Sequence, residues 1–212
     1  DAEGRPVRDA DSTTYVAGLL PVDRFGPLIK AEARRRGYAT ARRVVILSDG
    51  AKWCKTIAED HFPGATFILD FYHAAEHLHQ LALARYGPGS EADEVFHDWC
   101  AQMRDGRIAE ILDSVIDSAD QADDAEALHK ELAYLSDNAA RMQYNRYRAA
   151  GLFIGSGVVE AGCKTVVGHR TKHSGMHWGE AGVQAVATLR CALLSDRLDA
   201  FWDHVLAQPR AA

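Results

Sequence analysis

Two short β-branched runs, separated by a segment of helical character, limit most strongly what this chain can fold into. Residues 43–48 are apolar without alternation and too short for a helix, which is typical of a strand buried on both faces. Residues 65–69 repeat this pattern, and residues 51–60 between them predict a short helix. The order predicts a β-α-β crossover, in which the two strands run parallel.

Two more elements are predicted before this crossover. Residues 13–20 are β-branched and apolar and stop at Pro21, which predicts another strand. Asp23 is placed to cap a helix running to Arg36, where Gly37 supplies a left-handed stop. The chain therefore opens in the order β-α-β-α-β, which is typical of an α/β fold.

The pattern then changes to helical periodicity. Residues 72–147 read as three or four helices, with a break at the Gly-Pro-Gly of residues 87–89. This predicts three parts: a first part of the core at 1–71, an all-helical insertion at 72–150, and final helices at 151–212. We call residues 72–150 the helical block.

The net charge of −6 hides an uneven distribution. Residues 91–137 hold 14 acidic and three basic side chains, whereas the rest of the chain holds 16 acidic and 21 basic ones. Because the field at a surface depends on local charge, a basic face outside the acidic segment can still bind DNA. Four scattered cysteines and the lack of a long apolar run predict a cytoplasmic protein without a membrane partner.

Asp49 follows the predicted strand 43–48 directly. The carboxyl end of such a strand faces the crevice where α/β sheets bind ligands. Phosphoryl transfer there uses two divalent cations about 4 Å apart, held by acids from different elements. The alternative interpretation is structural, since Asp-Gly is also the commonest hairpin turn. The helix predicted after Gly50 favours a crossover, and with it the metal site.

Glu160 follows the sequence Gly155-Ser156-Gly157, which permits a tight turn before a helix. A solvated glutamate in a first helical turn, favoured by the helix dipole, is the structural alternative. A metal-binding acid beside phosphate-binding cations is, however, the arrangement that a nuclease-like site needs. Basic side chains do follow, with no further acid before Glu180: Lys164, His169, Arg170, Lys172 and His173.

His73, Glu76 and His77 match the inverted zinc-peptidase motif H-x-x-E-H. On a helix, the i, i+4 spacing lets two imidazoles reach one zinc. No motif singles out a third ligand, so structural histidines are the favoured interpretation. Asp70 and His73, at the end of strand 65–69, are instead candidates to orient metal ligands or DNA.

Several ordered segments carry a resemblance to a known family. They are VVILSDGAKW at 44–53, HFPGATFILDFYHAAEHL at 61–78, GLFIGSGVVEAGCKTVVGHRTKHSGMHW at 151–178 and LRCALLSDRLDAFW at 189–202. The chain resembles, over nearly its whole length, the bacterial insertion-sequence transposases of the Kra type, distant relatives of the Mutator superfamily. The resemblance implies an RNase H-like α/β fold with a DDE triad and a helical insertion before the last acid.

Under this resemblance Asp49 is the second triad acid and Glu160 the third, 111 residues later. The first aspartate belongs on an earlier strand in a V-D-G-like context, and no such motif precedes Thr13. The resemblance therefore implies an RNase H-like fold incomplete at its N-terminus, and an isolated chain that is inactive.

The implied function is transposition. Two Mg²⁺ or Mn²⁺ ions would activate water and then a DNA 3′-hydroxyl for attack at phosphorus. Lys164, Arg170, Lys172 and His173 would contact the backbone of terminal inverted repeats and target DNA, bound by a homo-oligomer at the nucleoid. The alternatives are a non-catalytic DNA-binding or regulatory remnant of a transposase, and a zinc hydrolase using the H-x-x-E-H residues.

Overall fold

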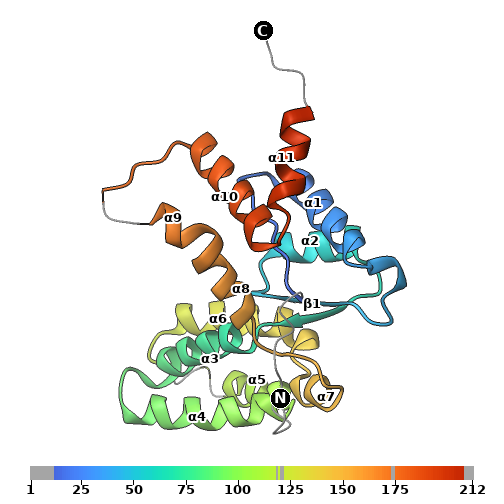
Figure 1. Cartoon of the computed structure of the whole chain (residues 1–212). Coiled ribbons are helices and arrows are strands. Elements are labelled where there is room, and N and C mark those ends of the chain that lie inside the picture. The colour runs from blue at the N-terminus through green and yellow to red at the C-terminus, as the bar shows by residue number, and fades with distance from the viewer. Residues whose placement is uncertain (1–11, 118, 120–121, 173–174, 208–212) are drawn as a thin grey trace, which may run out of the picture. The chain divides into compact units, whose positions relative to one another are not determined.

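The computed structural model describes residues 12–117, 119, 122–172 and 175–207, and it is mostly helical with a small parallel sheet (Figure 1). The chain divides into two compact units. The central unit is Thr40–Ser156, and the split unit combines Asp1–Ala39 with Gly157–Ala212.

The central unit begins with the predicted crossover. Strands β1 (Val45–Ser48) and β2 (Thr66–Leu69) pair in parallel, and helix α2 (Lys52–His61) connects them. Val45 lies opposite Thr66 and Ser48 opposite Leu69, so the carboxyl ends of both strands meet at one edge. The β-α-β prediction is therefore confirmed, with the strand limits shifted by one or two residues. The prediction that the first strand is buried on both faces was wrong, since Val45 is exposed and the other residues of β1 are half-buried.

The helical block is also confirmed as helical, although its described residues form five α-helices where three or four were predicted. The elements are α3 (Phe71–Tyr86), α4 (Ser90–Arg104), α5 (Ile108–Ile116), α6 (Ala125–Asn138), the 3-10 turn η4 (Ala139–Arg141) and α7 (Tyr144–Ala149). Helix α3 contacts both α4 and α6 and lies between them (Figure 1).

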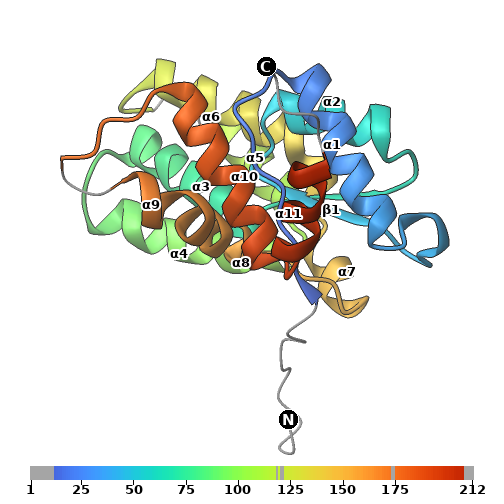
Figure 2. The same cartoon turned by 45° about the horizontal axis from the view of Figure 1, so that its top comes forward.

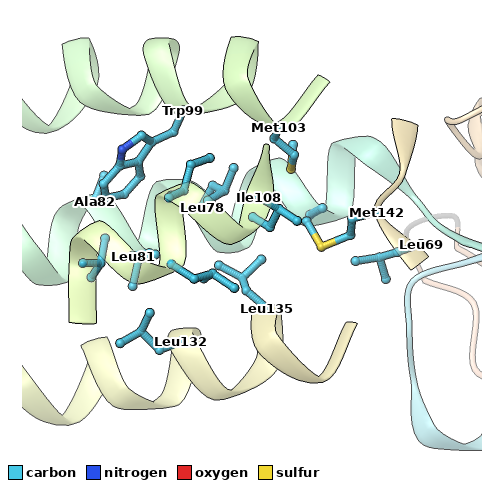
Figure 3. Close-up of a cluster of buried hydrophobic side chains, with 14 of the residues drawn as sticks. Leu69, Leu78, Leu81, Ala82, Trp99, Met103, Ile108, Leu132, Leu135 and Met142 are labelled. Atoms are coloured by element: carbon cyan, nitrogen blue, oxygen red, sulfur yellow. The ribbon is translucent and has the colours of Figure 1, made fainter. Parts of the chain in front are cut away.

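A single apolar core joins the sheet to these helices (Figure 3). Leu78 and Leu81 of α3 and Leu135 of α6 are fully buried in it. Ile68 and Leu69 of β2 are equally buried and belong to the same cluster. Residues 40–71 and the helical block thus share one core, in which the apolar faces of the helices pack against β2.

The split unit is helical. Helices α1 and α11 lie side by side in both views (Figures 1 and 2). Its elements are α1 (Val22–Arg35), the 3-10 turn η2 (Tyr38–Thr40) at the unit boundary, α8 (Gly157–Gly162), the π-helix η5 (Cys163–Gly168), α9 (His169–Thr171), α10 (Glu180–Leu194) and α11 (Leu198–Ala207).

The strand predicted at residues 13–20 was wrong, since this segment forms no strand. Its backbone N–H groups donate to side chains of the split unit: that of Tyr15 to Ser195 Oγ at 3.0 Å and that of Leu19 to Gln184 Oε1 at 2.7 Å. A strand needs the backbone groups of a neighbouring strand, and these amides bind side chains instead.

Helix α1 agrees with the prediction at its end but not at its start. It begins at Val22 after Pro21, so Asp23 lies within the first turn and is not the cap. A carboxylate there is still favoured by the helix dipole. Gly37 follows the helix with φ +85°, as expected for a left-handed stop.

Glu32 of α1 is a buried acid that binds Arg197, the residue directly before α11. Its Oε2 accepts from Arg197 Nη1 at 2.7 Å and from Arg35 Nε at 3.0 Å. Burial by itself raises the pKa of Glu32, but hydrogen bonds from Arg197 and Thr14 and the charges of both arginines outweigh it, and the pKa falls from 4.5 to about 2. The carboxylate therefore stabilises the split unit fully above pH 4.5, and this contribution is lost as the pH falls toward 2.

Arg197→Ala should lower the free energy of unfolding by about 1–3 kcal/mol at pH 7, because a buried carboxylate loses a charged donor. The deficit relative to wild type should shrink as the pH falls from 4.5 toward 2, because the unfolded chain takes up a proton at Glu32 that the folded wild type, with a Glu32 pKa of about 2, resists. Urea unfolding at several pH values measures this. Arg34→Ala, at an exposed position of α1, is the control; a deficit independent of pH would contradict the prediction.

Candidate functional site

Asp49 lies where the sequence predicts it, directly after β1 and exposed. Its Oδ1 accepts from the Ala51 N–H at 3.1 Å and lies 3.8 Å from Cys54 Sγ, at the start of α2. The parallel pairing of β1 with β2 rules out a hairpin at this turn. Asp49 is thus an exposed carboxylate on a short turn between two regular elements.

The turn requires glycine at position 50. Gly50 has φ +79°, which disfavours any other residue. A Cβ there would also lie 2.6 Å from Leu69 Cδ1 and 2.9 Å from Tyr134 Oη. The turn therefore fits closely against β2 and α6.

Asp70 follows β2 and is buried, with 2% of its surface exposed. Its Oδ1 caps α3 by accepting from the His73 N–H at 2.8 Å, and its Oδ2 accepts from the Ser156 N–H. The Phe71 N–H donates to the Ile154 carbonyl at 2.8 Å. Both Asp70 oxygens are therefore engaged by backbone amides, and they tie residues 154–156 to the end of β2.

The two histidines of the H-x-x-E-H motif lie side by side on α3, with ring centroids 4.9 Å apart. His77 Nδ1 lies 2.5 Å from Glu131 Oε2 of α6, whereas His73 Nδ1 lies 3.4 Å from Glu76 Oε2 of its own helix. Within the described part of the chain, no group of three or more His, Cys, Asp or Glu side chains is arranged to hold a metal ion. His77 contributes a contact between helices.

Glu160 is exposed in the first turn of α8, the helix that precedes π-helix η5. Arg190 of α10 contacts this π-helix, because its Nε lies 3.0 Å from the carbonyl oxygens of both Thr165 and Val166. The helical path after Glu160 is therefore held from α10.

The predicted DNA-binding residues follow along this path. Lys164 lies in the π-helix η5, Arg170 lies in α9 and Lys172 follows α9; all three are exposed. His173 lies outside the described residues. Exposed cations on short consecutive turns suit contacts with phosphate oxygens.

Within the units, the structure brings together some of the predicted residues. Asp49, Asp70 and His73 belong to the central unit, where the ends of β1 and β2 are neighbours. Glu160, Lys164, Arg170 and Lys172 belong to the split unit. Convergence of the Asp49 and Glu160 carboxylates stays a prediction.

Neither Tyr134 nor Arg190 was predicted to be a site residue, although each contacts a segment that carries one. Tyr134 Oη donates to the Asp49 carbonyl at 2.7 Å. In the sequence, Tyr134 is one more position in a helical pattern and Arg190 one more charged residue among apolar ones. No local signal marks either residue, because both contacts are long-range.

The chain belongs to the uncharacterised protein family UPF0236, whose sequence profile matches residues 32–199. The matched range includes Asp49, the helical block and Glu160. No curated protein and no solved structure matches the chain. In the part of the chain that the structure describes, no helix combines the length and apolarity that crossing a membrane requires.

Proposed function

We propose that this chain is part of the catalytic region of a DDE transposase, with an RNase H-like fold interrupted by the helical block. The observation that carries the proposal is the exposed Asp49 carboxylate at the carboxyl end of a parallel strand, inside the S-D-G-A motif of the resembled family. That edge of a sheet is where α/β folds place their ligands.

The types of residue present suit the binding of divalent cations. Carboxylate oxygens are the ligands that Mg²⁺ and Mn²⁺ prefer, and both Asp49 and Glu160 are exposed. When bound, the two ions would stabilise the attacking and leaving oxygens at phosphorus. Asp49 and Glu160 would hold them, while Lys164, Arg170 and Lys172 would bind the phosphates of terminal-repeat and target DNA. We also propose that the protein acts as a homo-oligomer bound to DNA at the nucleoid.

The covalent chain supports a shared metal site. The Ser156 N–H is bound to Asp70, which follows β2, and β2 ends beside the end of β1 that leads into Asp49. Only four residues lead from Ser156 to Glu160, so their Cα atoms lie within about 14 Å of each other. We expect the Asp49 and Glu160 carboxylates to approach within about 8 Å without metal.

Iron-directed cleavage tests this site without requiring catalysis. Fe²⁺ in place of Mg²⁺, with ascorbate and peroxide, should cut the wild-type backbone near both residue 49 and residue 160. Asp49→Asn and Glu160→Gln should each abolish both cuts, because the two carboxylates hold the same ions. Asp60→Asn, at an exposed position of α2, should retain them. Cuts at one site only, or cuts that survive in Asp49→Asn, would defeat the proposal.

The same preparations separate the alternatives. A non-catalytic DNA-binding remnant would bind DNA in a salt-dependent manner but show neither metal-directed cut. A zinc hydrolase would carry stoichiometric zinc that disappears in a His73→Ala, His77→Ala double variant. The transposase proposal requires both cuts and no such zinc.

A further inference from the structure

Helix α6 contacts the turn that carries Asp49 through a tyrosine side chain. Tyr134 Oη donates to the Asp49 carbonyl at 2.7 Å, across 85 residues of sequence. The same oxygen lies 2.9 Å from where a Cβ on Gly50 would be. The hydroxyl therefore contacts both residues at the tip of the turn.

The position of Tyr134 is itself fixed by the helical block. Its ring stacks on His77 of α3, with centroids 3.6 Å apart and an angle of 19° between the planes. His77 in turn binds Glu131, a buried residue one turn earlier on α6.

Asn138, one turn further along α6, also lies close to Gly50. Its Oδ1 lies 2.9 Å from where a Cβ on Gly50 would be, and its Nδ2 donates to the Tyr134 carbonyl at 2.8 Å. The turn thus rests on two consecutive turns of α6. A tilt of this helix would move the Asp49 backbone, and the carboxylate would follow because Oδ1 is bound to the Ala51 N–H.

We propose that Tyr134 is a positioning residue, through which the helical block sets the direction of the Asp49 carboxylate. Metal ligands must be held within about 0.5 Å of their productive geometry, and rigid neighbouring elements usually supply that precision. The hydrogen bond and the ring stack meet this need. The metal-binding consequence rests on the proposed function, whereas the support of the turn does not.

Hydrogen exchange of Tyr134→Phe tests the support directly, because phenylalanine keeps the ring stack and loses only the hydroxyl. The amides of Gly50 and Ala51 should exchange about two- to tenfold faster, the effect of one lost neutral hydrogen bond. Amides within β2 and α3 should be unchanged. Tyr86→Phe, the same substitution at the far end of α3, should leave the turn unaffected. An unchanged turn, or equal acceleration throughout the central unit, would overturn the proposal.

A Mn²⁺ titration followed by electron paramagnetic resonance adds the functional readout. Tyr134→Phe should weaken the Mn²⁺ binding that Asp49→Asn abolishes by a similar factor, while Tyr86→Phe should leave it intact. Faster exchange at the turn, in a wild type that binds no Mn²⁺ through Asp49, would support the positioning role and defeat the proposed metal site. Mn²⁺ binding that depends on Asp49, together with unchanged amide exchange at the turn in Tyr134→Phe, would support the proposed metal site and overturn the positioning role.

Discussion

Replacing both Arg170 and Lys172 with glutamate is expected to lower DNA affinity about 10- to 100-fold near physiological salt. Both side chains are exposed on the path that follows Glu160, where the proposed function places the phosphate backbone. Each lost phosphate contact retains counterions on the DNA, so the slope of log K against log salt should flatten by about 0.9 per contact, or about 1.8 in total. Fluorescence anisotropy on labelled duplexes at several salt concentrations measures both effects.

The loss should be similar for terminal-repeat and unrelated sequences, because phosphate contacts carry no base information. Arg107→Glu with Lys130→Glu is a matched control, since it reverses two exposed charges in the acidic segment. An equal loss in that control would mean that net charge alone governs binding. The His73→Ala, His77→Ala variant should leave the salt slope unchanged if it remains folded.

Leu78→Ala is expected to lower the free energy of unfolding of the central unit by about 3–5 kcal/mol. Leu78 is fully buried on α3, the helix that contacts both α4 and α6 (Figure 3). The substitution removes apolar contacts on several sides, whereas alanine keeps the helix propensity. Urea unfolding followed by circular dichroism measures the change.

The control for this variant is Ile116→Ala at the end of α5, a residue that is 54% exposed. Its cost should stay below about 1 kcal/mol, since little apolar surface leaves the core. Because β2 shares the core with α3, hydrogen exchange in β2 should rise together with that of the helices in Leu78→Ala. A variant that loosens the helices and leaves β2 protected would show that the sheet and the helical block have separate cores.

Much of the central unit follows from local sequence. The runs that became β1 and β2 are short and β-branched, and the segment between them has helical periodicity, so the parallel crossover was predictable. Position in that crossover also placed Asp49 at the end of a strand. Gly37 was predictable for the same kind of reason, because a left-handed helix end requires little beyond the residue itself.

Residues 13–20 show where local patterns fail. Their composition suits a strand, but a strand exists only where another strand supplies hydrogen-bond partners, and here the side chains of Ser195 and Gln184 take that place. Asp70 differs from that segment: its place after a strand suggested that it orients metal ligands or DNA, and this stays a prediction. Its burial and its hydrogen bonds to two backbone amides could not be read from the sequence.

Local pattern thus decided the type and order of most elements and the residue at the tip of the Asp49 turn. Tertiary structure alone decided which side chains support that turn and the Glu160 helix. Tyr134 lies 85 residues from Asp49, Glu131 lies 54 from His77, and Arg190 lies 25 from Thr165. Periodicity reports only which face of a helix is apolar. A hydrogen bond between distant segments depends on how those faces pack, because packing brings its donor and acceptor together.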